Sequence, residues 1–158
     1  MATRAGSVDP GLLLWLVTEA GMDPGDVADG IDRRGGLLAL AGTKDMAEVV
    51  GRAASGDDDA TLALDVYVHR LAASVAAMTA SLGGLDALVV TGGVGEKAAE
   101  VRRRLGAALG HLGIVVDEAR NAAAEPDCDI SSDGAVPLLV VAAREDAEIA
   151  RGARDVLG

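Results

Sequence analysis

The fold class of this chain is decided by one stretch of ten residues, Leu88-Val89-Val90-Thr91-Gly92-Gly93-Val94-Gly95-Glu96-Lys97. Its apolar start predicts a buried strand over residues 87–90, which leads through a glycine-rich turn into a helix predicted over 96–112. Glycines let a backbone come close to a ligand, and the free N–H groups at a helix start favour an anion. The spacing is neither that of a Walker A loop nor that of the dinucleotide motif G-x-G-x-x-G. By itself, the stretch fits a plain strand-to-helix connection as well as a nucleotide contact.

Strand and helix signals alternate along the chain. Two more apolar segments, 114–117 and 137–141, predict strands, and segment 37–41 predicts a buried strand or a loop core. Segment 118–135 is polar and is predicted to be irregular. This alternation predicts an α/β layered domain, with few strands for the amount of helix. The predicted helices follow Pro10 and Pro24 and cover residues 44–54, 60–82, 96–112 and 145–156.

The composition limits the classes of partner. The chain has 158 residues, half of them apolar, which is enough for one domain with a core and excludes disorder as its main state. It has no Phe, one Trp and one Tyr, so the core must be built from Ala, Val and Leu. A net charge of −11 argues against a nucleic-acid partner. A nucleotide phosphate would have to be held locally, by backbone N–H groups or a metal ion.

Cysteine usage and hydropathy bear on the compartment. Cys128 is the only cysteine, so no internal disulfide can form, which favours a reducing, cytoplasmic setting. Cys128 falls in a predicted polar loop, and nothing near it marks it as a nucleophile. No apolar run is long enough to cross a bilayer, and residues 1–10 lack a secretory signal, so no membrane partner is expected.

Three other places carry residues that could take part in chemistry. Asp45 precedes a predicted helix, where an N-cap role is the simplest interpretation. Glu145 and Asp146 follow the last predicted strand, where they could hold Mg²⁺ but could equally cap the next helix. Arg4 lies near the start of the chain, where an arginine is usually a solvated residue.

Taken together and in order, these segments resemble the acetate kinase family, which includes acetate and propionate kinases. The family's Thr-Arg-x-Gly-Asp-x-Asp-Pro is similar to residues 3–10, and its Ser-Gly-Leu-x-Gly-x-x-Gly to residues 35–42, followed by Asp-x-Arg at 45–47. A long helix with Tyr67, His69 and Arg70 is similar to the family's Tyr-Arg helix. The most specific signature, Phe-Thr-Gly-Gly-Ile-Gly-Glu-Asn, is close to residues 90–97. The resemblance covers nearly the whole chain.

The resemblance implies a fold of the actin, hexokinase and sugar-kinase group, which is ribonuclease H-like and has two α/β domains around a nucleotide cleft. Residues 1–158 would be the C-terminal nucleotide-binding domain, with the N-terminal domain absent. The implied activity is ATP-dependent phosphoryl transfer to acetate or propionate, giving an acyl phosphate and ADP with the help of Mg²⁺. This chain would be incomplete for that reaction. It would form a homodimer, for which the apolar helix over 60–82 is the expected contact surface.

The family's site residues map onto this sequence one by one. Arg4 would stabilise the phosphoryl group during transfer, and Glu145 would be the magnesium-site glutamate. Asp45 and Met46 would line the adenosine site. The nucleotide would be held by Gly93, Val94, Gly95, Glu96 and Lys97.

Four positions depart from the family pattern. Ser7 replaces an Asp, Ala47 an Arg, and both Lys97 and Arg144 an Asn. The first three changes alter polar contacts near the expected nucleotide. They leave an alternative open, in which the chain is a non-catalytic nucleotide-binding or dimerisation module derived from the family.

Overall fold

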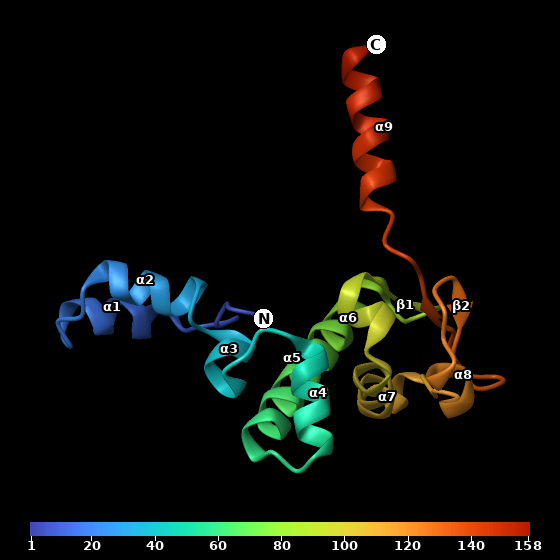
Figure 1. The fold of residues 1–158 in the computed structure, drawn as a ribbon, viewed down its shortest axis with the longest axis horizontal. Coiled ribbons are helices and arrows are strands. Elements are labelled where there is room, and N and C mark those ends of the chain that lie inside the picture. The colour runs from blue at the N-terminus through green and yellow to red at the C-terminus, as the bar shows by residue number, and fades with distance from the viewer. The chain divides into compact units, whose positions relative to one another are not determined.

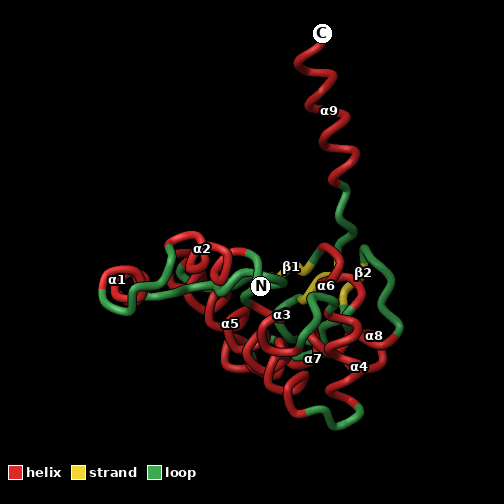
Figure 2. The backbone as a smooth tube through the Cα atoms, turned by 60° about the vertical axis from the view of Figure 1, so that its left-hand side comes forward, coloured by secondary structure: helices red, strands yellow, loops and turns green.

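The computed structural model describes all residues from Met1 to Gly158 (Figure 1). The chain divides into two compact units, Met1–Ala73 and Ser74–Gly158. The strands all lie in the second unit, and helix dominates elsewhere (Figure 2). No helix combines the length and apolarity that a bilayer span requires.

The first unit is entirely helical, and aspartates start its first helices. Asp9 accepts hydrogen bonds from the N–H groups of Gly11 and Leu12, and Asp23 makes the equivalent bonds at the second helix. A proline follows each aspartate, as expected at the first helical position. These predicted helix starts are confirmed. The helices of this unit are α1 (Pro10–Thr18), α2 (Pro24–Asp32), α3 (Gly36–Ala41), α4 (Met46–Ala54) and the first part of α5 (Asp58–Leu82).

Small aliphatic side chains fill the core of this unit, as the composition predicts. The fully buried positions on α5 are Ala60, Ala63 and Leu64, and Val49 of α4 is buried to the same extent. Alanines at such positions let helices approach closely, at the cost of little apolar area per residue. The remaining buried apolar residues of the unit are Val27, Leu37, Ala41, Met46, Val68 and Ala72.

The prediction of a strand or loop core at residues 37–41 is wrong. This segment is helix α3, which ends at Gly42 with a left-handed φ of 71°. Leu and Ala are among the best helix formers, and a short apolar run has no periodicity that separates a buried strand from a buried helix. Gly42, which is typical of a helix C-cap, is the sequence feature that indicates a helix here.

The second unit contains a mixed three-stranded sheet in the order β1-β3-β2. β1 pairs in parallel with β3, with Leu88 opposite Leu138, and β2 pairs antiparallel with β3, with Cys128 opposite Val140. Cys128 therefore lies in a strand and not in a polar loop. The elements after α5 are β1 (Leu88–Val90), α6 (Gly92–Lys97), α7 (Ala99–Ala108), the 3-10 helix η1 (Gly110–Leu112), α8 (Glu118–Ala122), β2 (Cys128–Asp129), β3 (Leu138–Val140) and α9 (Glu145–Leu157).

The central strand of this sheet is the buried one, not β1. Leu138 and Val140 of β3 are completely buried, whereas Val89 of β1 is 52% exposed. A strand between two neighbours is covered by both, while β1 lies at an edge and has a neighbour on one side only. The predicted burial of this strand is therefore wrong at Val89, although the strand itself is confirmed.

Three further predictions in this unit are corrected. The single helix expected over 96–112 is broken at Ala98, giving α6, α7 and η1. The strand expected over 114–117 is reduced to one bridge between Val116 and Ser131. The polar segment 118–135 contains α8 and β2, because Asp117 caps a helix through the N–H of Arg120.

Candidate functional site

The glycine-rich segment after β1 is itself a helix, α6, and not a turn that precedes one. Gly92 is its first residue, with a φ of 72° that favours glycine, and Thr91 before it is extended. The helix start is therefore four residues earlier than the sequence predicts.

The three glycines of α6 have different structural reasons. Gly92 is required by its positive φ. A Cβ on Gly95 would lie 3.1 Å from the Val90 carbonyl carbon, so Gly95 lets α6 pack on the end of β1. A Cβ on Gly93 would meet nothing within 4 Å. Gly93 is thus the glycine for which the chain's own packing gives no reason, and it marks an open face of α6.

Glu96 links α6 to the segment that follows β3. Its Oε1 accepts a hydrogen bond of 2.9 Å from the N–H of Gly92 and another of 2.9 Å from the N–H of Ala143. Residues 96 and 143 are thereby held together although they are far apart in sequence. The carboxylate of Glu96 is occupied by the protein's own backbone, and Lys97 beside it is exposed.

A buried arginine holds the other end of α6. Arg102 of α7 is 3% exposed, and its Nη1 donates to the carbonyl oxygens of Gly95, at 2.9 Å, and Glu96, at 2.7 Å. Its Nε and Nη2 donate to Asn121 of α8, which is equally buried. Burial lowers the pKa of Arg102 because the charged guanidinium has lost its water. This pair was not predicted from the sequence.

The segment between β3 and α9 carries Glu145 on an exposed helix start. Arg144 forms an ion pair with Asp127, which has a φ of 71° and also accepts from the N–H of Ala142. The Arg144 guanidinium, followed by the Ala142 N–H, holds the pKa of Asp127 below its usual range. Arg144, which replaces the family's asparagine and directly precedes Glu145, is thus anchored to Asp127 at the start of β2.

Glu145 and Asp146 lie in the first turn of α9, and no side chain caps that helix. Nowhere in the chain do three or more His, Cys, Asp or Glu side chains gather as metal ligands would. Any metal ion at Glu145 would therefore need ligands from outside this chain, such as phosphate oxygens and water.

Arg4 lies in an N-terminal segment that runs against Gly35 and Gly36, in the first unit. The N–H of Gly35 donates to the carbonyl of Thr3 at 2.7 Å, and a Cβ on Gly36 would lie 1.9 Å from the carbonyl oxygen of Met1. The two glycines therefore allow the segment to approach. The Arg4 side chain is exposed and forms an ion pair of 2.8 Å with Asp32.

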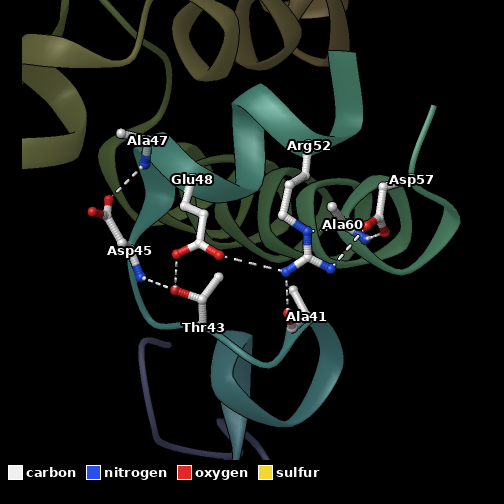
Figure 3. Close-up of polar contacts among 8 residues, drawn as sticks. All are labelled: Ala41, Thr43, Asp45, Ala47, Glu48, Arg52, Asp57 and Ala60. Atoms are coloured by element: carbon white, nitrogen blue, oxygen red, sulfur yellow. Dashed lines mark hydrogen bonds and ion pairs between the residues drawn. The ribbon is translucent and has the colours of Figure 1, made fainter. Parts of the chain in front are cut away.

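Asp45 acts as the N-cap of α4. Its Oδ1 accepts from the N–H of Ala47 at 2.8 Å, and its own N–H donates to Thr43 Oγ1 (Figure 3). Asp45 is exposed, whereas Met46 is only 6% exposed and belongs to the core. The capping role favoured by the sequence is confirmed.

Behind this turn, Arg52 ties α4 to its neighbours. It donates to the carbonyl of Ala41 at 2.7 Å and pairs with Asp57 at 2.9 Å (Figure 3). Asp57 also caps α5 by accepting from the N–H of Ala60. The Ala60 N–H and then Arg52 lower the pKa of Asp57, and the Asp57 carboxylate raises the pKa of Arg52.

The structure thus groups the predicted site residues by unit. In the second unit, Glu96 brings residues 93–97 beside the segment that leads into Glu145. Arg4, Asp45 and Met46 belong to the first unit.

Comparison with known proteins gives one consistent result. A family model described as the acetokinase family matches residues 1–151. An acetate kinase of Leifsonia xyli subsp. xyli is 47% identical over 155 residues, covering 97% of this chain and 39% of that protein. An acetate kinase of Nostoc punctiforme is 42% identical over 159 residues, with 99% and 39% covered.

Solved structures agree with this result. A propionate kinase from Francisella tularensis matches with a TM-score of 0.89 and 34% identity, covering 96% of this chain and 39% of that one. An acetate kinase from Porphyromonas gingivalis matches with a TM-score of 0.89 and 33% identity, covering 100% and 40%. The α/β fold class of the actin, hexokinase and sugar-kinase group is confirmed. The chain spans about two fifths of the length of these relatives.

Proposed function

The chain belongs to the acetokinase family, and from this premise we propose that it is the nucleotide-binding part of a kinase that transfers a phosphoryl group from ATP to acetate or propionate. The single observation that carries the proposal is the open face at Gly93, on a segment similar to the family's most specific signature. Backbone conformation accounts for Gly92 and packing accounts for Gly95, whereas neither accounts for Gly93, whose open side leaves room for a ligand.

The proposed roles follow the geometry. Residues 93–97 would contact the nucleotide, with the exposed Lys97 within reach of a phosphate. Asp45 would contact adenosine from a turn that Met46 anchors in the core. Glu145 would take part in holding Mg²⁺, since a single carboxylate fits an ion held mainly by nucleotide phosphates. Arg4 would stabilise the charge that develops on the transferring phosphoryl group.

The proposal is tested by calorimetric titration of the 158-residue chain with ATP, with and without Mg²⁺. Saturable binding that strengthens with Mg²⁺ is expected. A chain that is folded by circular dichroism but releases no heat with ATP would contradict the proposal and favour the dimerisation form of the alternative, a non-catalytic module derived from the family.

We further propose that residues 1–158 are the C-terminal domain of the kinase. The support is that Arg4 and the glycine segment both fall in motifs that resemble those of that domain. A share of 39% of the relatives' length would fit an N-terminal placement equally well. The two placements differ in where the rest of the kinase is encoded: upstream of Met1 for the first, downstream of Gly158 for the second. An in-frame kinase sequence downstream would overturn the C-terminal placement.

The chain alone is expected to show no acetate kinase activity. In-line transfer requires both substrates in one closed site, and this chain spans only about two fifths of its relatives. The measurement is a coupled assay of ADP release with pure protein. Acetate-dependent release above the no-enzyme rate, lost in the Arg4→Ala variant, would refute this expectation.

A homodimer is expected in solution, but its surface needs revision. The predicted helix α5 uses Ala60, Leu64 and Val68 in the core of its own unit, so this part cannot be the contact. Helix α1 is apolar and has no buried residue, and its Leu12, Leu14 and Trp15 are exposed. Two-fold pairing is the commonest way to cover such a surface.

Light scattering should give twice the monomer mass at micromolar concentration, and Leu14→Glu should give the monomer mass. A parent chain that is already monomeric would contradict it.

A further inference from the structure

We propose that Arg102 is a positioning residue that fixes the backbone of α6 for nucleotide binding. This inference rests on the proposed function of the glycine segment and extends it to a residue that does not itself face the open side of α6.

Arg102 supplies hydrogen bonds to carbonyl groups at the end of α6. A helix of six residues leaves its last carbonyl groups without partners, and solvent or a cap must supply them. One nitrogen, Nη1 of Arg102, donates to two of these carbonyls, at Gly95 and Glu96. Both residues belong to the segment proposed to hold the nucleotide, so the guanidinium sets the orientation of the peptide groups that the ligand would meet.

Arg102 is itself fixed by hydrogen bonds to α8. Its Nε donates to Asn121 Oδ1 at 2.7 Å, and its Nη2 donates to the Asn121 carbonyl at 3.0 Å. The Asn121 Nδ2 donates in turn to the carbonyl of Ala99, at the start of α7. α6, α7 and α8 therefore share one hydrogen-bond network in which no buried polar side-chain atom lacks a partner. A fully satisfied buried network makes its members rigid.

The energetics of burial also favour a positioning role for Arg102. The guanidinium is buried among neutral acceptors, without a carboxylate bonded to it. Removing a cation from water in this way is unfavourable, and a well-packed apolar side chain of similar volume is often the more stable choice. Stability alone therefore does not account for an arginine here, whereas control over two carbonyl groups of α6 does.

The test compares Arg102→Lys with a control of similar stability. Lysine keeps the charge but lacks the planar fork that spans two carbonyls and Asn121. Ile130→Ala is the control, because Ile130 is completely buried beside β2, at the opposite edge of the sheet from β1 and α6. Two readouts are needed: the dissociation constant for Mg-ATP by calorimetry, and amide hydrogen exchange at residues 93–98 without ligand. Thermal melts are used to match the loss of stability.

Arg102→Lys is expected to weaken ATP binding by about tenfold or more and to speed exchange at residues 93–98. The Ile130→Ala control should leave both close to the parent's values. If Arg102→Lys does not fold, Asn121→Ala takes its place, because it removes one partner of Arg102 and leaves the Nη1 donors present. A smaller effect in the same direction is then expected.

If Arg102→Lys and Ile130→Ala change the dissociation constant for Mg-ATP and the exchange at residues 93–98 equally, Arg102 is an ordinary core residue and the inference is wrong. Unchanged exchange at residues 93–98 in Arg102→Lys would also overturn it. If the parent chain binds no ATP, the proposed function fails first, and the exchange readout alone still decides whether Arg102 fixes α6.

Discussion

Gly93→Val should abolish ATP binding while the chain keeps its fold. Space around the position is open, since an added Cβ meets nothing within 4 Å and the residue has no positive φ. The branched side chain therefore enters the proposed nucleotide site and not the core. Calorimetry should show a dissociation constant raised by about a hundredfold or beyond measurement, as for the loss of a close backbone contact of about 3 kcal/mol. The circular-dichroism spectrum should stay nearly unchanged.

The neighbouring glycine supplies the matched control. A Cβ on Gly95 would crowd the Val90 carbonyl carbon at 3.1 Å, so Gly95→Val should lower the melting temperature as well as ATP affinity. The pair separates a ligand-facing glycine from a packing glycine within one short helix. If Gly93→Val binds ATP as well as the parent does, α6 is only a connection from β1 to α7, and the proposed site is wrong.

Most elements could be predicted where local chemistry decides them. Asp9 and Asp23, each followed by proline, mark helix starts that the structure confirms. Segment 37–41 could not be assigned, because five apolar residues have no period that separates helix from strand. The burial of β1 could not be judged either, because an apolar strand has the same composition at the edge of a sheet as at its centre.

The site likewise has features that the local sequence indicates and contacts that only the fold creates. The glycine signature and the capping role of Asp45 are local, and the sequence indicates both. The link from Glu96 to Ala143 joins residues 47 positions apart, and the Arg102–Asn121 pair spans 19. No pattern in a single sequence connects such positions, because tertiary packing alone creates the contact. An arginine among the apolar positions of the predicted helix 96–112 was the one available signal, since a charge on a buried face calls for a specific partner.

The largest expected loss of stability comes from Gly36→Ala, in the unit that carries Arg4. An alanine Cβ would lie 1.9 Å from the Met1 carbonyl oxygen and 2.9 Å from that of Arg4, and both are backbone atoms that cannot rotate away. The φ of 63° adds conformational strain for any residue with a Cβ. Together these effects should reduce the free energy of unfolding by about 3 kcal/mol.

Urea unfolding followed by the fluorescence of Trp15, the only tryptophan, measures this loss in the unit concerned. Gly42→Ala is the matched control, because Gly42 has a similar φ of 71° but nothing within 4 Å of an added Cβ. Its cost should be about 1 kcal/mol, from backbone strain alone. The difference between the two variants isolates the close approach of the N-terminal segment to α3. A Gly36→Ala variant that loses no more stability than Gly42→Ala would mean that this segment is not held against Gly36, and the placement of Arg4 by these glycines would be wrong.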